Sequence, residues 1–581
     1  MAALHRSVAD DLVETLVHAG VSRIYGLVGD SLNAFSDAVR RDGRIAWIHV
    51  HNEEAAAFAA SAEAQLTGRL AVCAGSCGPG NTHLVQGVMD AHRSGAPVLA
   101  LASHITSRQI GTGYFQETKP EALFAQTSHY CETVAHPDQM NRLARSAIQS
   151  AILDRGAAVL VLPGDILAEH SAGEPPGRPV LAAGSRRVPD PAAVDELLTR
   201  IESAERITIF GGIGCADARE QVLRLGGLLH APIGHTLRGK DILDYDNPNN
   251  VGMTGLLGYG ACYRALHDAD LVLLLGTDFP YDDFLPRRNN IQIDLDPVRL
   301  GRRAPLAQGI VADIGAVLDA VLPRLSQRVD RGFLDEMLHA HERALRHSVD
   351  TYSTHIATHR PIHPEHLAAL VDELAAQDAV FTADTGMCCT WAARYITPNG
   401  RRRLIGSFVH GSMANALPMA IGAQLAYPGR QIVSLSGDGG LAMLLGELLT
   451  VKTHRLPVKV VVFNNSSLGM VRLEMMVAGD PPFETDHDEV DYAAIAAAAG
   501  FHTRRVTEPG ELREAVRDVL GHDGPALLDV VTTPDALEVP SHLTVEEARG
   551  FALGLGKTMV TGGVGEIANI ARLNLRNIPR P

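Results

Sequence analysis

Residues 433–440, VSLSGDGG, join an apolar run to a turn that holds Asp438 between glycines. Gly and Asp both tolerate the unusual dihedral angles of tight turns, so the stretch taken alone also fits a plain turn. The run that begins it has the β-rich composition of a buried strand. Other parts of the sequence are therefore needed to distinguish a plain turn from a turn whose carboxylate has a function.

The surroundings of this stretch predict a parallel α/β unit. We expect a strand at residues 431–435, a helix at 441–453 and a second, very apolar strand at 458–463. A unit of the same kind, strand, glycine turn, helix and strand, is expected at residues 70–74, 75–80, 81–93 and 97–102. The glycine turns follow the carboxyl ends of strands, which is where α/β sheets bind ligands.

The chain divides into three such regions and a tail. The middle region has its own strands followed by polar or glycine turns, at residues 206–214, 270–277 and 291–294. Segments rich in Pro, Gly, Ala or His, at 172–190 and 351–364, are typical of linkers. The predicted class is therefore α/β, with three parallel-sheet domains and a short C-terminal tail, at residues 1–182, 186–337, 338–535 and 536–581.

Composition excludes several classes of protein. A chain of 581 residues with 46% hydrophobic and 20% charged residues is ordinary for a soluble multidomain protein. A formal net charge of −16 argues against nucleic-acid binding. No apolar run is long enough to cross a bilayer, and the N-terminus lacks the pattern of a signal peptide. The seven cysteines suggest free thiols in a reducing compartment, because no second pair completes a metal clip with Cys73 and Cys77.

A second polar turn matches the one that holds Asp438. Asn465 lies just after the strand expected at 458–463. Because both turns open at the same edge of the sheet, we expect the two side chains to face one point as oxygen ligands for Mg²⁺. The glycines beside Asp438 let backbone N–H groups approach a diphosphate. GDG followed by NN after an apolar strand resembles the metal-diphosphate motif of thiamine diphosphate (ThDP) enzymes.

The resemblance to ThDP enzymes implies a second element. A glutamate must hydrogen-bond the aminopyrimidine ring of the cofactor so that the thiazolium C2 can lose its proton. In the family this glutamate lies in a pattern near H-E-x-x-A, and the matching stretch here is HNEEAAAF at residues 51–58. We assign the role to Glu53, with Glu54 as the competing choice. An acidic helix start favoured by the helix dipole is the alternative without a cofactor.

Nearly the whole chain resembles the ThDP- and FAD-dependent pyruvate dehydrogenase (quinone), or pyruvate oxidase, family. The stretches that carry the resemblance include GYFQETKPEALF, NNVGMTGLLG, LLLGTDFPY and WAARYITPNGRRRLIGSFVHGSMANALP. The resemblance implies ThDP, Mg²⁺ and FAD as cofactors, in a pyrimidine-binding, a central FAD-binding and a diphosphate-binding domain. The implied reaction is oxidative decarboxylation of pyruvate to acetate and CO2 by ThDP ylide chemistry, with electrons passing through FAD to a membrane quinone.

The same resemblance implies an assembly and a location. The pyrimidine and diphosphate sites of this family come from different subunits, so at least a dimer is expected, and a tetramer is usual. The expected location is the cytoplasm, in peripheral association with the inner face of the cell membrane.

The resemblance also implies roles residue by residue. The metal ligands would be Asp438, Asn465 and the carbonyl of Ser467. The catalytic residues would be Glu53, Phe115, Gln116, Met470 and Glu474. ThDP would contact Glu53, Gly411, Ser412, Met413, Asp438, Gly439, Gly440, Asn465, Ser466, Ser467, Leu468, Gly469, Met470 and Val471. FAD would contact Thr254, Gly255, Leu256, Leu257, Thr277, Asp278, Phe279, Pro280, Tyr281 and Asp294.

Three positions depart from the family pattern. Asn52, Thr385 and Met470 stand where the family has His, Val and Phe. Met is softer and more flexible than Phe, so these changes leave open a 2-keto acid substrate other than pyruvate. Two further functions also stay open: an oxidase that uses O2, and a non-redox ThDP decarboxylase or ligase in which FAD is structural or missing. A non-enzymatic cofactor-binding protein is disfavoured by the intact Glu53, Asp438 and Asn465.

The C-terminal tail carries a membrane hypothesis of its own. Residues 557–581 hold four basic side chains and one acidic side chain. Apolar residues share one helical face there, at Val564, Ile567, Ala568, Ala571 and Leu575. This pattern fits a basic amphipathic helix on an anionic lipid surface, although glycines upstream weaken helix formation. A tail that is docked on its own protein or disordered is the alternative, and the two readings are compatible.

Overall fold

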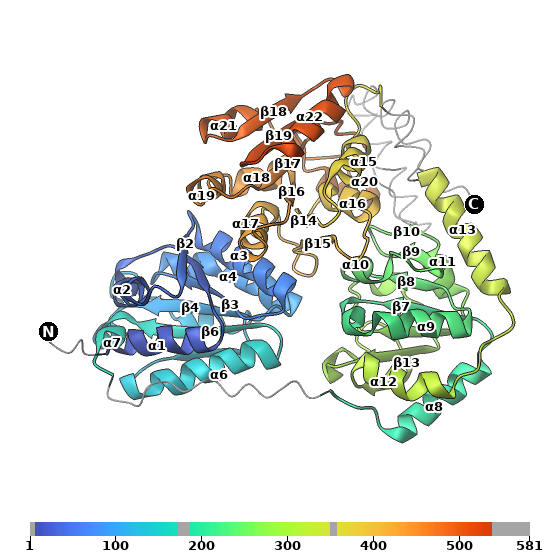
Figure 1. Cartoon of the computed structure of the whole chain (residues 1–581), viewed down its shortest axis with the longest axis horizontal. Coiled ribbons are helices and arrows are strands. Elements are labelled where there is room, and N and C mark those ends of the chain that lie inside the picture. The colour runs from blue at the N-terminus through green and yellow to red at the C-terminus, as the bar shows by residue number, and fades with distance from the viewer. Residues whose placement is uncertain (1–5, 172–185, 349–356, 537–552, 554–581) are drawn as a thin grey trace.

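The computed structural model describes residues 6–171, 186–348, 357–536 and 553. These residues form three α/β lobes, coloured blue to cyan, green to yellow-green, and yellow to red in Figure 1. Each lobe is built on one sheet whose strands are parallel, apart from one antiparallel edge pair. The predicted α/β class with three parallel-sheet domains is thereby confirmed. The predicted amphipathic tail at 557–581 and most of the first linker lie outside the described residues.

The first lobe has a six-stranded sheet in the order β2-β1-β3-β4-β6-β5. Its strands are β1 Arg23–Gly26, β2 Ala46–His49, β3 Ala71–Gly75, β4 Val98–His104, β5 Tyr130–Thr133 and β6 Ala157–Pro163. Its helices are α1 Val8–His18, α2 Asn33–Asp42, α3 Glu53–Thr67, α4 Pro79–Ser94, α5 Pro120–Leu123, α6 Met140–Leu153 and α7 Gly164–Ala168. The unit predicted at 70–102 is present as β3, α4 and β4.

The middle lobe has a seven-stranded sheet in the order β10-β9-β8-β7-β11-β12-β13. Its strands are β7 Ile207–Gly211, β8 Ile233–His235, β9 Asn250–Met253, β10 Tyr259–Gly260, β11 Leu271–Leu275, β12 Asn290–Asp294 and β13 Leu306–Val311. Its helices are α8 Pro191–Ser203, α9 Arg219–Leu229, α10 Lys240–Leu243, α11 Cys262–His267, α12 Ile314–Val321 and α13 Gly332–Ser348. Without β10 this is the strand order of dinucleotide-binding folds. The expected start of the third domain, residue 338, falls within α13, which packs on β9 and β10.

The third lobe has a six-stranded sheet in the order β15-β14-β16-β17-β19-β18. Its strands are β14 Val380–Ala383, β15 Arg403–Gly406, β16 Ile432–Gly437, β17 Lys459–Asn464, β18 His502–Val506 and β19 Ala526–Val531. Its helices are α15 Pro364–Leu374, α16 Met387–Tyr395, α17 Ala416–Ala426, α18 Asp438–Met443, α19 Glu447–Thr453, α20 Gly469–Ala478, α21 Tyr492–Ala498 and α22 Pro509–Gly521. Counted from its first strand, this sheet repeats the order of the first lobe, so the two lobes share one topology.

One predicted helix is wrong in its extent. The single helix expected at residues 441–453 is two shorter helices, α18 and α19, separated by a turn at 444–446. Gly446 ends this turn, and glycine lowers helix propensity by about 1 kcal/mol relative to alanine. Helix α18 begins at Asp438 itself, directly after β16 and three residues before the predicted start.

The first and third lobes share one hydrophobic core. The alanine-rich helix α3 packs against α17, and the two helices lie side by side between the lobes in Figure 1. Contact is so close that a Cβ on Gly422 would lie 2.1 Å from the carbonyl oxygen of Ala59. The hydroxyl of Tyr427 donates to the carbonyl of Leu66 at 2.9 Å. These two lobes are therefore fixed against each other, although the middle lobe separates them in sequence.

Within the described residues, none of the helices has both the length and the hydropathy that a membrane span requires. All seven cysteines are free of disulfide bonds. Among the same residues, no cluster of three or more His, Cys, Asp or Glu side chains is arranged to hold a metal. The predicted metal site differs from such clusters because it combines one carboxylate with an amide and a carbonyl.

Candidate active site

The candidate site lies where the strand order of the third sheet reverses. From β14 the chain continues to β15 on one side and then to β16 on the other side. Asp384 follows β14 and Asp438 follows β16, so both carboxylates stand at this switch point, where α/β sheets bind ligands. A Cβ on Gly440 would lie 2.3 Å from Asp384 Oδ2. Gly440 is therefore required by the approach of Asp384.

The Asp438 carboxylate is buried, with 2% of the residue exposed. Its Oδ1 accepts a hydrogen bond from the Gly439 N–H at 2.8 Å, and its Oδ2 accepts one from the Ser466 N–H at 2.6 Å. Burial raises its pKa above the ordinary value, against the lowering effect of these hydrogen bonds and of His487. A divalent cation at this carboxylate would compensate for the lost hydration of its charge.

The turn after β17 faces the same point. Asn465 Oδ1 accepts a hydrogen bond from the Ser467 N–H at 3.1 Å, and Ser466 adopts a left-handed conformation with φ 52°. The Ser467 hydroxyl oxygen is buried and has no hydrogen-bond partner. The two turns that the sequence predicted to meet are thus joined, since Ser466 donates to Asp438.

A pocket of about 260 Å³ opens at this meeting point. It is lined by residues of the third lobe alone. The predicted site residues among them are Gly411, Met413, Asp438, Gly439, Gly440, Asn465, Ser467, Leu468, Gly469, Met470, Val471 and Glu474. The pocket suits a metal ion with a diphosphate. Its buried carboxylate can bind the ion, its glycines leave room for the diphosphate, and its unpartnered Ser467 hydroxyl can donate a hydrogen bond. Sequence reasoning missed Asp384, Met387, Cys388 and Trp391 as lining residues.

Two predicted contacts stand beside this pocket without lining it, Ser412 and Ser466. The Ser412 side chain is turned toward the first lobe, where Gln86 Nε2 donates to its Oγ at 2.9 Å. Gln86 Oε1 also lies 3.2 Å from His410 Nε2. Helix α4 of the first lobe therefore holds the turn that carries Gly411 and Met413.

Glu53 lies at the start of α3, in the first lobe, and is 4% exposed. Its Oε2 is 3.0 Å from His83 Nδ1 on α4. Asn52, one of the departures from the family pattern, caps α3 by accepting the Glu54 N–H at 2.9 Å. Burial raises the pKa of the competing Glu54. Glu53 lines no part of the pocket of its own chain.

Phe115 and Gln116 also lie in the first lobe and outside this pocket. Phe115 is 78% exposed, although it is a large apolar side chain. Gln116 adopts a left-handed conformation with φ 63°, and its Oε1 lies 3.4 Å from the Cys77 thiol sulfur. The structure therefore groups the two residues with the glycine turn after β3 and leaves Phe115 open to solvent.

The predicted flavin contacts gather at the carboxyl ends of the middle strands. Thr254 follows β9, Thr277 follows β11 and Asp294 ends β12. The Thr254 hydroxyl oxygen is buried without a hydrogen-bond partner, and burial raises the pKa of Asp294. At the switch point between β7 and β11, a Cβ on Gly212 would lie 2.6 Å from the carbonyl oxygen of Gly276. These features fit a dinucleotide, whose polar groups would reach the unpartnered Thr254 hydroxyl.

The flavin segment also reaches the third lobe. Arg394 of α16 donates to the carbonyl of Gly258, just after the predicted flavin contacts at 254–257, at 3.2 Å. Met387, Cys388 and Trp391 of the same helix line the pocket. The candidate flavin segment and the candidate ThDP pocket therefore adjoin each other.

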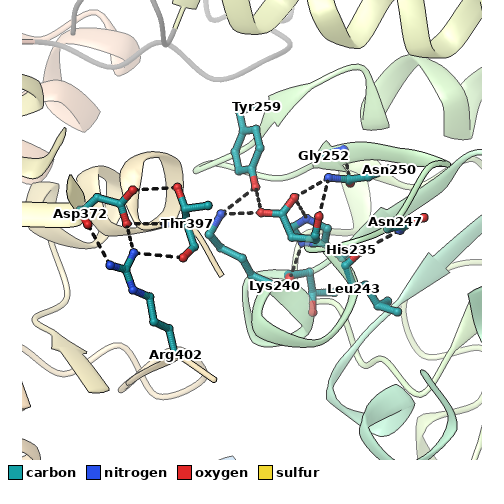
Figure 2. Close-up of polar contacts among 12 residues, drawn as sticks. His235, Lys240, Leu243, Asn247, Asn250, Gly252, Tyr259, Asp372, Thr397 and Arg402 are labelled. Carbon is teal, nitrogen blue, oxygen red and sulfur yellow. Dashed lines mark hydrogen bonds and ion pairs between the residues drawn. The ribbon is translucent and has the colours of Figure 1, made fainter. Parts of the chain in front are cut away.

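A buried ionic cluster supports the hairpin that carries Thr254. Lys240 Nζ lies 2.8 Å from Asp244 Oδ2 and 2.9 Å from the Tyr259 hydroxyl. Asn250 also donates to Asp244. Lys240 and Tyr259 point toward each other in Figure 2, with His235 and Asn250 beside them. This cluster holds the hairpin of β9 and β10 through Asn250 and Tyr259. Arg394 of α16 holds the turn between the two strands, because it donates to the Gly258 carbonyl at 3.2 Å.

Comparison with known proteins agrees with this arrangement. Residues 6–123 match the N-terminal TPP binding domain of thiamine pyrophosphate enzymes, residues 194–321 the central domain, and residues 384–530 the C-terminal TPP binding domain. Thiamine pyrophosphate (TPP) is another name for ThDP. Together the matches place one domain of the family in each lobe.

Full-length relatives match nearly the whole chain. YdaP of Bacillus subtilis, which is named for thiamine pyrophosphate, is 34% identical over 94% of this chain and 95% of its own length. Pyruvate oxidase of Lactiplantibacillus plantarum is 29% identical over 93% and 91% of the two chains. Acetolactate synthase 1 of Zea mays is 29% identical over 90% and 85%. The chain belongs to the family of thiamine pyrophosphate enzymes.

Proposed function

We propose that this protein oxidatively decarboxylates pyruvate, or a closely related 2-keto acid, in a ThDP-dependent reaction. Pyruvate and water give acetate and CO2, and two electrons and two protons pass to a quinone. The observation that carries the proposal is the pocket in which the turns of Asp438 and Asn465 meet. This pocket offers the side chains and backbone groups that would bind the metal and the diphosphate of the cofactor. The candidate flavin segment adjoins it.

The residues of the pocket have distinct tasks. Asp438, Asn465 and the Ser467 carbonyl would hold Mg²⁺ and, through it, the diphosphate. Met413 would support the middle of the cofactor, and Glu474 would hold a proton near the substrate. ThDP, when bound, supplies the electron sink that makes decarboxylation of a 2-keto acid feasible.

A second copy of the chain would complete each site. Glu53, Phe115 and Gln116 lie outside the pocket of their own chain, and we assign them to the pocket of a partner subunit. Phe115 is exposed together with Ile110 and Tyr114, and this group supports the assignment, because grouped apolar side chains open to solvent mark contact surfaces. At least a dimer, and by family resemblance a tetramer, follows.

The redox branch of the proposal rests on the middle lobe. Thr254, Thr277 and Asp294 would hold FAD, which when bound accepts two electrons and passes them on. The contact of α16 with the turn at Gly258 would place this electron carrier near the pocket. The basic tail at 557–581 supports a peripheral location at the inner, cytoplasmic face of the membrane, where quinone is available.

A non-redox reaction is the second candidate. Acetolactate synthase 1 of Zea mays is as similar to this chain as pyruvate oxidase is, at 29% identity each. Thr385 and Met470, which line the pocket and depart from the expected pattern, are the residues that would change the substrate. An oxidase that hands its electrons to O2 is the third branch and is supported by the relative named pyruvate oxidase.

One experiment separates these branches. The purified protein is loaded with ThDP, Mg²⁺ and FAD, and its flavin absorbance is followed after pyruvate is added without oxygen. We expect bleaching, followed by recovery when a quinone analogue is added. Recovery with O2 alone would indicate an oxidase. A flavin that pyruvate does not bleach, together with acetolactate among the products, would refute the redox proposal. The variant Asp438→Asn, which lacks the proposed metal ligand, is the control, and we expect pyruvate to leave its flavin unbleached.

A further inference from the structure

The loop after α20 folds back over the predicted metal turn. The His487 N–H donates to the Ser466 carbonyl at 3.0 Å, and the Leu468 N–H donates to the Thr485 carbonyl at 2.7 Å. Between these bonds Ser467 and Asp486 form an antiparallel bridge. The loop backbone is therefore fixed to the turn that carries Asn465.

This backbone pairing brings an imidazole to Asp438. His487 Nε2 lies 3.7 Å from Asp438 Oδ2. It also lies 3.9 Å from the position that a Cβ on Gly439 would take, so the ring stands over the glycine turn. The side chain is about one-third exposed, while that of Asp438 is buried. No sequence motif pointed to this histidine, because its loop returns from beyond α20.

The other ring nitrogen of His487 is already engaged. Nδ1 lies 3.2 Å from the carbonyl oxygen of Asp488, which can only accept a hydrogen bond. The Nδ1–H tautomer follows, and in the neutral ring it leaves the lone pair of Nε2 free on the side that faces Asp438. Metal-binding histidines show this arrangement, in which the second nitrogen donates to a carbonyl and orients the ring.

We propose that His487 is a further protein ligand of the divalent ion, together with Asp438, Asn465 and the Ser467 carbonyl. This inference rests on the proposed function, because it concerns the same ion. Three protein oxygens and a diphosphate leave room at an octahedral ion for one more group. Neighbouring ligands of such an ion lie roughly 3 Å apart, so a small rotation of the exposed ring closes the 3.7 Å gap.

A nitrogen ligand changes which ion the site prefers. Sites made only of oxygen suit Mg²⁺, whereas imidazole favours ions later in the first transition row, such as Co²⁺. Mn²⁺ accepts both kinds of ligand and is visible by electron paramagnetic resonance. The site of this chain is therefore expected to bind Mn²⁺ and Co²⁺ more tightly, relative to Mg²⁺, than the same site without His487.

The test uses pulsed electron paramagnetic resonance of the full chain loaded with Mn²⁺ and ThDP. A directly bound imidazole gives nitrogen modulation that changes when histidine is labelled with ¹⁵N. We expect this modulation in the wild type and in Asp488→Asn, a control on the same loop that keeps the carbonyl. We expect its loss in His487→Gln, with a measurable fall in the ratio of Mn²⁺ to Mg²⁺ affinity.

The outcomes separate this inference from the proposed function. Bound Mn²⁺ without histidine modulation in the wild type would overturn the role of His487 and leave the ThDP site standing. Failure of the wild type to bind Mn²⁺ in the presence of ThDP would overturn both. Modulation that survives in His487→Gln would also overturn the inference, because another histidine would then be the ligand.

Discussion

The backbone N–H of Ser466 donates to Oδ2 of Asp438 at 2.6 Å, which joins the turns after β16 and β17. An asparagine at 438 would lack the charge and would present an N–H₂ group to one of the two donors that now reach the carboxylate. We expect Asp438→Asn to abolish binding of Mg²⁺ and ThDP. At about 100 times the dissociation constant, binding stabilises a protein by about 2.7 kcal/mol, and calorimetric unfolding would show the variant losing this gain. Asp486→Asn, an exposed change nearby, is expected to keep it.

The variant Glu53→Gln tests the role assigned to the Glu53 carboxylate of the first lobe. The glutamine keeps the shape of the buried side chain but cannot hold a negative charge, so we expect turnover to fall by at least about 10²-fold. Flavin content and ThDP binding are expected to persist, which absorbance and calorimetry would show. Glu54→Gln is the matched control, with less than about threefold loss. A larger loss in Glu54→Gln than in Glu53→Gln would reverse the assignment.

Gly440→Ala tests the packing of the switch point. Its Cβ would lie 2.3 Å from Asp384 Oδ2, so the turn or the carboxylate must move. We expect thermal unfolding without cofactors at a clearly lower temperature, with a loss of about 1–3 kcal/mol. Gly437→Ala is the matched control three residues earlier, because its Cβ would have only the Cys388 sulfur near it, at 3.9 Å. Equal stability of the two variants would contradict the close approach of Asp384.

Lys240→Met tests the buried ionic cluster of the middle lobe. The change removes the ammonium group 2.8 Å from Asp244 and leaves this largely buried carboxylate with only the neutral donors Asn250 and Tyr259 and with His235 nearby. We expect a loss of about 3–5 kcal/mol in the free energy of unfolding of this lobe, measured by urea titration. The double variant with Asp244→Asn is expected to recover part of the loss. The exposed Lys452→Met should change the free energy by no more than about 0.5 kcal/mol.

Glu447 links the first and third lobes and predicts a pH dependence of stability. Its Oε1 accepts the His51 N–H at 3.1 Å, its Oε2 accepts the Thr450 hydroxyl at 2.6 Å, and burial raises its pKa to about 7. The pKa of Glu447 in the folded protein exceeds the ordinary value of 4.5, so folding favours its protonated form. The contribution of this group to the free energy of unfolding is therefore complete below about pH 4.5 and is lost as the pH rises through about 7. We expect Glu447→Gln to gain stability relative to the wild type between these pH values, by up to about 3 kcal/mol. A difference between the two proteins that is the same at pH 5 and pH 8 would contradict this account.

Much of the fold was predictable from local sequence. Apolar, β-rich runs such as the one before Asp438 marked the strands, because central strands of parallel sheets are buried on both faces. Because consecutive parallel strands end at one edge of a sheet, the sequence alone predicts that Asp438 and the turn of Asn465 meet. The three-lobed α/β class followed from the same units repeated along the chain.

Other parts of the site depend on contacts between distant segments. Asp384 also follows a strand, and that signal could have marked it, yet its approach to Gly440 depends on strand order. His487 reaches Asp438 only because its loop pairs with the backbone of residues 466–468. The pairing of Lys240 with Tyr259 joins the short helix α10 to strand β10, which no periodicity connects. Sequence patterns locate strands and turns, whereas these neighbours are set by how the sheets are assembled.

The close packing of α3 on α17 has a consequence for synthesis on the ribosome. The first lobe leaves the ribosome before α17 exists, because the whole middle lobe is translated in between. At roughly 5–20 residues per second, the delay is tens of seconds. Throughout this interval the alanine-rich face of α3, which approaches Gly422 in the finished protein, has no partner in its own chain. A nascent chain of this protein therefore exposes this apolar helix face until the third lobe has been made and covers it.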